Sequence, residues 1–110
     1  MSDAPDTSAL HYELDGNVAV IHFDDGKANV LGHAAIEALH VLLTRSEDDE
    51  AAAVVIIGRP GKFSAGFDLA VMTAGPDQAR DLLRAGAELA LRIYTFPIPV
   101  VLGATGMGKV

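Results

Sequence analysis

The sequence contains no cysteine, which excludes disulfide bonds and thiolate metal sites. Basic residues are scarce: 8 lysines and arginines stand against 15 aspartates and glutamates, for a net charge of −7. Binding to nucleic acid or to an anionic membrane needs a basic face, so this charge argues against both partners. No apolar run approaches the ~20 residues of a membrane-spanning helix, and the acidic N-terminus is unlike a signal peptide. A cytoplasmic location is therefore expected.

Aromatic residues make up only 5% of the chain and tryptophan is absent, although half of all residues are hydrophobic. The apolar content therefore consists mainly of alanine, valine, leucine and isoleucine. The length of 110 residues suits a single domain. A chain of this composition can bury a core, and it has apolar surface left for a partner subunit or for further sequence.

Periodicity and turn chemistry predict a hairpin followed by alternating helices and strands. An Asp15-Gly16 turn between extended segments is a strong hairpin signal. Apolar residues recur at helical spacing in two later stretches, and the prolines at 97 and 99 end the second. The elements expected are strands at 10–14 and 17–23, a helix at 33–45, a strand at 53–57, a helix from 76 or 77 to 94, and a strand at 100–102. This order predicts an α/β fold with a mostly parallel sheet.

Two segments carry more specific predictions. In the second strand, Val18, Val20 and His22 alternate with apolar residues, so both faces are largely apolar and the strand is expected to be covered on both sides. The acidic run at 46–50 is expected to be a solvated connector between the first helix and the next strand.

Residues 61–69, Gly-Lys-Phe-Ser-Ala-Gly-Phe-Asp-Leu, form the most informative stretch of the chain. They follow an apolar strand and lead toward a helix start, through a turn of small residues that leaves backbone N–H groups accessible. A helix N-terminus adds a partial positive charge, so the arrangement suits an anionic ligand or an oxygen that becomes anionic during a reaction. The alternative is an ordinary strand-to-helix connection built from small residues.

A second motif, Lys-Ala-Asn-Val-Leu at 27–31, favours the functional interpretation. These two stretches, their separation and the later Phe-Pro-Ile-Pro-Val-Val at 96–101 resemble the crotonase (enoyl-CoA hydratase/isomerase) superfamily over almost the whole chain. The resemblance implies the N-terminal part of a crotonase-like ββα spiral. Residues 1–9 would be a flexible leader, and 10–110 would end before the family's second glycine-rich motif.

The resemblance also implies roles for individual residues. Phe67 would give its backbone N–H to an oxyanion hole for a thioester oxygen, and Gly66 would keep the approach open. Coenzyme A is then part of the substrate, and neither a separate cofactor nor a metal is expected. The residues implied to bind coenzyme A are Lys27, Ala28, Val30, Lys62, Ala65, Asp68 and Leu69.

Two lysines of this set match positions that face the phosphates of coenzyme A. Taken singly, Lys27 and Lys62 are each more typical of an ordinary solvated loop. Together with Arg59, however, they place local positive charge in the two loops of an otherwise acidic protein, as a polyphosphate ligand requires.

The function implied is binding of an acyl-CoA thioester and stabilisation of its enolate, with hydration of a 2-enoyl-CoA or the reverse reaction as the leading interpretation. For a full-length chain, assembly into a homo-trimer or hexamer is expected with it. The two glutamates that handle water and the proton in hydratases of the family have no counterpart in this sequence. Members without them perform isomerisation, hydrolysis, decarboxylation or dehalogenation. A second hypothesis is an inactive fragment that binds coenzyme A weakly or associates with full-length subunits.

Two further features have alternative interpretations. Residues 103–109, Gly-Ala-Thr-Gly-Met-Gly-Lys, match the phosphate-binding pattern G-x-x-x-x-G-K. Val110 stands where that pattern has serine or threonine for magnesium, so a nucleotide site is a remote alternative. The histidines at 11, 22, 33 and 40 show no metal spacing and no nearby partner pair, which predicts structural roles.

Overall fold

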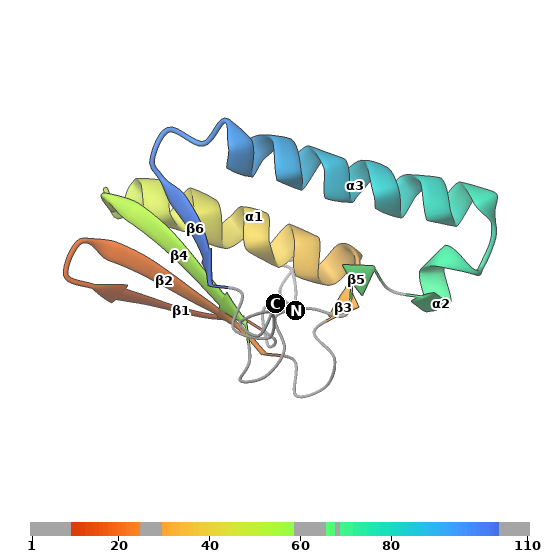
Figure 1. The fold of residues 1–110 in the computed structure, drawn as a ribbon, viewed down its shortest axis with the longest axis horizontal. Coiled ribbons are helices and arrows are strands. Elements are labelled where there is room, and N and C mark those ends of the chain that lie inside the picture. The colour runs from red at the N-terminus through yellow and green to blue at the C-terminus, as the bar shows by residue number, and fades with distance from the viewer. Residues whose placement is uncertain (1–9, 25–29, 59–65, 68, 104–110) are drawn as a thin grey trace, which may run out of the picture.

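The computed structural model shows an α/β fold in which helices cover one face of a mixed, mostly parallel sheet (Figure 1). It describes residues 10–24, 30–58, 66–67 and 69–103; the expected leader at 1–9 lies outside them. The main sheet has the order β1-β2-β4-β6, with β1 antiparallel to β2 and the other pairs parallel. Its strands are β1 (Leu10–Asp15), β2 (Val18–Phe23), β4 (Ala53–Gly58) and β6 (Val100–Gly103). The predicted fold class is confirmed.

The remaining elements connect these strands. The helices are α1 (His33–Asp48), α2 (Leu69–Met72) and α3 (Pro76–Tyr94), and two short strands, β3 (Val30–Leu31) and β5 (Gly66–Phe67), form a separate parallel pair. The second long helix begins and ends where the sequence predicts. The hairpin is also confirmed: Asp15 pairs with Val18, and Gly16 adopts the left-handed φ of 63° that favours glycine.

The core lies between the sheet and the two long helices, α1 and α3. Ala19, Ile21 and Phe23 of β2 point into it and are at most 2% exposed, and alternate residues of β4 do the same. The opposite residues of β2 are only half-buried, so the prediction that both faces are covered is wrong for the part of the chain that the structure describes. Successive crossovers in one direction place α1 and α3 on the same side of the sheet, as Figure 1 shows.

Helix α1 runs three residues further than predicted, and the acidic run at 46–50 is therefore not wholly a connector. Ser46 lies on the buried side of the helix, where its hydroxyl donates to the Leu43 carbonyl at 2.6 Å. Because no glycine or proline interrupts this segment, the helix continues to Asp48; two residues later Glu50 has a φ of 56°, which is incompatible with a helix. The charged residues Glu47 and Asp48 therefore form the exposed side of the last turn of α1.

Tyr12 and Asp49 join the first strand to the end of α1. The Tyr12 hydroxyl donates to Asp49 Oδ2 at 2.7 Å, and the Arg45 guanidinium lies 4.3 Å from the centre of the tyrosine ring. Burial, with the hydrogen bond to Asp49, raises the pKa of Tyr12 to about 12. The contact keeps the hairpin against the helix that covers it.

Arg92 of α3 fixes the two long helices to each other. Its Nη1 donates to Nδ1 and to the carbonyl of His40 on α1, both at 3.0 Å, while Nη2 donates to the Thr44 hydroxyl at 2.9 Å. Glu47 lies 3.5 Å from the same guanidinium. Since arginine has no acceptor, the contact requires His40 to be neutral with its proton on Nε2.

Stability is expected to fall as the pH drops below the usual histidine pKa of 6.5. Burial and then the charge of Arg92 lower the pKa of His40, against opposing effects of Glu88 and Glu37. The unfolded chain then binds more protons than the folded one, so the contribution is complete above pH 6.5 and is lost as the pH decreases. Denaturant unfolding between pH 8 and pH 5 measures it. His40→Gln should flatten the profile, and an unchanged slope in that variant would contradict the assignment.

Candidate functional site

Two loops leave the sheet side by side at the carboxyl ends of its central strands. Phe23, the last residue of β2, is the register partner of Gly58, the last residue of β4. The loops that follow contain the two sequence motifs, at 27–31 and 61–69. In sheets of this kind, the loops at the carboxyl ends of parallel strands are the usual place for a ligand.

The same loops come together again at their far ends. Val30 pairs with Gly66 and Leu31 pairs with Phe67, so β3 and β5 form a parallel two-stranded sheet. These strands are not predicted by the sequence, because two residues are too few to show a periodicity. The pairing nevertheless places the ends of both motifs in contact, although 36 positions separate each pair of partners (66 − 30 and 67 − 31).

The described residues include four of the predicted site residues. Val30, Gly66 and Phe67 lie in the β3–β5 pair, and Leu69 begins α2, a single helical turn. The other predicted site residues, Lys27, Ala28, Lys62, Ala65 and Asp68, lie outside the described residues, as does Arg59. The roles predicted for all of them therefore remain predictions, and the β3–β5 pair is the part of the site whose backbone is placed.

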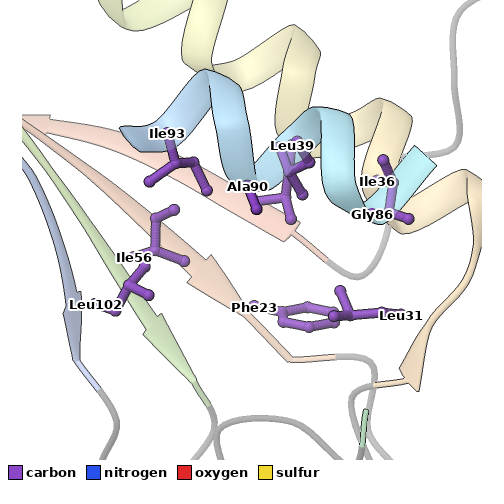
Figure 2. Close-up of a pocket in the computed structure, with 10 residues that line it drawn as sticks. Phe23, Leu31, Ile36, Leu39, Ile56, Gly86, Ala90, Ile93 and Leu102 are labelled. Carbon is purple, nitrogen blue, oxygen red and sulfur yellow. The ribbon is translucent and has the colours of Figure 1, made fainter. Parts of the chain in front are cut away.

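An apolar cavity of about 290 Å³ lies next to this pair, between the sheet, α1 and α3 (Figure 2). Leu31, the register partner of Phe67, lines it together with Phe23. The lining residues are Phe23, Leu31, Ile36, Leu39, Ile56, Gly86, Leu89, Ala90, Ile93 and Leu102. None of them has a polar side chain to orient a thioester, so any polar contact to a substrate must come from the backbone or from the loops.

Two histidines face each other on the uncovered side of the hairpin. His11 and His22 are register partners with ring centres 6.0 Å apart, and Glu13 lies 3.8 and 3.9 Å from their Nε2 atoms. The prediction that no histidine has a nearby partner is wrong for this pair, because the antiparallel register joins residues 11 positions apart. Within the described ranges, no group of three or more His, Cys, Asp or Glu could hold a metal ion.

Among the described residues, no helix combines the length and the apolar character needed to cross a membrane.

Comparisons with known proteins agree with the α/β fold described above. The sequence pattern of the enoyl-CoA hydratase/isomerase family matches residues 13–109. An enoyl-CoA hydratase/isomerase family protein from Pseudomonas syringae has 34% sequence identity and a TM-score of 0.86, and the match covers 91% of this chain and 43% of that chain. No curated protein sequence gives a significant match.

Mycobacterial structures are also similar. A probable enoyl-CoA hydratase from Mycobacterium tuberculosis has 43% identity and a TM-score of 0.82, with 86% of this chain and 41% of that chain covered. A second structure of the same protein, described there as an enoyl-CoA isomerase, has 40% identity and a TM-score of 0.82, and the match covers 88% of this chain and 42% of that chain. The chain therefore spans less than half the length of the solved structures that it matches. The likeness confirms the crotonase-like fold.

Proposed function

Because this chain belongs to the enoyl-CoA hydratase/isomerase family, we propose that it binds an acyl-CoA thioester and stabilises the thioester's enolate. The observation that carries the proposal is the pairing of β3 with β5. It joins the backbone of Leu31, at the end of the first motif, to that of Phe67, near the end of the second. The two stretches that the resemblance assigns to one ligand are adjacent in space at this point.

In the proposed mechanism the backbone N–H of Phe67 donates to the thioester oxygen. This oxygen gains negative charge when the substrate becomes an enolate, so a fixed donor stabilises the enolate more than the neutral thioester. Gly66 has no side chain to obstruct the approach. The donor belongs to the backbone, so it does not depend on which side chain occupies position 67.

Hydration of a 2-enoyl-CoA is the reaction proposed for the site. Water adds its hydroxyl to C3 and a proton reaches C2, with the enolate as the intermediate that Phe67 would stabilise. The chain offers no residue to which we assign the proton transfers, and isomerisation uses the same enolate. One relative from Mycobacterium tuberculosis is described as a probable hydratase in one structure and as an isomerase in another.

The test of the function is calorimetric titration of the chain with crotonyl-CoA, with free coenzyme A and with ATP and magnesium. The proposal expects crotonyl-CoA to bind, and coenzyme A to bind more weakly because it lacks the acyl group. Binding of ATP that depends on magnesium, without binding of crotonyl-CoA, would instead support the phosphate-loop alternative at 103–109. An inactive fragment that associates with full-length subunits would bind neither ligand.

Replacing either loop lysine by glutamine is expected to weaken crotonyl-CoA binding about twofold to fivefold. Lys27 and Lys62 are proposed to contact the phosphates, and an ion pair exposed to solvent contributes at most about 1 kcal/mol. The loss should shrink at high salt, because salt screens exposed charges. Calorimetry at two salt concentrations measures both effects. Lys109→Gln removes the same charge outside the proposed contacts and should leave the affinity unchanged; an equal loss in that variant would indicate only a general charge effect.

A further inference from the structure

The histidine pair of the hairpin, His11 and His22, takes no part in the proposed acyl-CoA function. The two residues are register partners of β1 and β2, and their ring centres lie 6.0 Å apart with the rings tilted by 39°. Side chains directly opposite each other in an antiparallel pair leave the sheet from adjacent positions on the same face. Neutral imidazole is the commonest metal ligand in proteins, so two imidazoles held at this spacing can act together on one ion.

Both imidazoles turn their Nε2 atoms toward the same carboxylate. His11 Nε2 lies 3.8 Å from Glu13 Oε1, and His22 Nε2 lies 3.9 Å from Glu13 Oε2. These distances exceed a hydrogen bond, so Glu13 does not hold either nitrogen tightly. Its negative charge nevertheless lies beside the point on which the two nitrogens converge, and it favours a cation there.

The histidine pair is accessible, and the protein attracts cations. The side chains of His11 and His22 are 72% and 41% exposed, so an ion reaches them without disturbing the core. The net charge of −7 raises the local concentration of cations. Imidazole ligands suit zinc, copper and nickel, whereas magnesium and calcium prefer oxygen. Because the described residues contain no group of three metal-binding side chains, water would complete the coordination of such an ion.

We propose that His11 and His22 together bind one divalent ion of the zinc, copper and nickel class. Each Nε2 donates its lone pair to the ion, so each ring carries its proton on Nδ1. The pair lies beside the Leu10–Phe23 pair, at the end of the hairpin opposite to its turn. An ion bound there joins β1 to the end of β2 from which the first site loop leaves. It fixes the register of the two strands, so binding of the metal is coupled to folding of the hairpin.

The test is calorimetric titration of the untagged full chain with Zn²⁺ and, separately, with Mg²⁺. Zn²⁺ should bind at one ion per chain, and Mg²⁺ should not bind at the same concentrations. His11→Gln and His22→Gln should each weaken Zn²⁺ binding about tenfold or more, because a single imidazole lacks the advantage of two linked ligands. His33→Gln removes an exposed histidine at the start of α1 and is the matched control, which should leave the affinity unchanged. An equal loss in the control, or no loss in the other two variants, would overturn the proposal.

Two measurements locate the ion without relying on the affinity of a variant. In nuclear magnetic resonance spectra of the wild-type chain, a small amount of paramagnetic Cu²⁺ should broaden the ring signals of His11 and His22 before those of His33 and His40. The urea midpoint of unfolding should rise with Zn²⁺ concentration, because the unfolded chain does not hold the pair in register, and His22→Gln should abolish this rise. Broadening that begins at the acidic run 46–50, or a midpoint that does not respond to Zn²⁺, would contradict the proposal.

Discussion

Replacing Phe67 by proline is expected to weaken binding of an acyl-CoA enolate roughly 10-fold to 100-fold. Proline has no backbone N–H, so the variant removes the proposed oxyanion donor itself. A hydrogen bond to a charged group contributes about 1.5–3 kcal/mol, and each 1.4 kcal/mol corresponds to a factor of ten. The loss for a neutral thioester should be smaller, because the oxygen carries less charge.

The ligand for this measurement is acetoacetyl-CoA, whose enolate absorbs in the near ultraviolet. Bound to the wild-type chain, it should ionise at a lower pH than in solution, since the donor favours the anion. Phe67→Ala keeps the N–H and removes the ring, so it is the matched control and should preserve most of the ionisation. If the alanine variant lost as much as the proline variant, the side chain would be responsible and the backbone donor would be excluded.

Replacing Phe23 by alanine is expected to cost about 3–5 kcal/mol in the free energy of unfolding. Phe23 is 2% exposed and is among the largest fully buried side chains of the described residues. It ends β2 at the point where the first loop leaves the sheet, so the core and the proposed site share this residue. Domains are typically stable by only 5–15 kcal/mol, so the variant should lose much of its stability.

Urea denaturation monitored by circular dichroism measures this change. Tyr94→Ala removes an aromatic ring that is 87% exposed and should change the stability by less than about 0.5 kcal/mol. Equal losses in the two variants would mean that the core does not depend on Phe23. A Phe23→Ala chain as stable as the wild type would show that the cavity beside this ring collapses to fill the space.

Several elements could be predicted from the sequence because their causes are local. The Asp-Gly turn predicted the hairpin, and apolar spacing with prolines at both ends predicted α3. The unbroken run of valine and isoleucine predicted β4 as a central strand, which it is. The two motifs and their separation predicted the family, and the family pattern matches residues 13–109.

The sequence by itself thus determined the order of the main elements, the fold class and the family, since turn chemistry, periodicity and motif spacing are properties of neighbouring residues. Only the tertiary structure decided which distant residues meet. It pairs Leu31 with Phe67 and His11 with His22, and it places both long helices on one face of the sheet. It also extends α1 through Ser46, because burial against the sheet stabilises a turn that its charged sequence does not predict. Strand register and the direction of crossovers set these contacts, and neither is encoded in a short stretch of the chain.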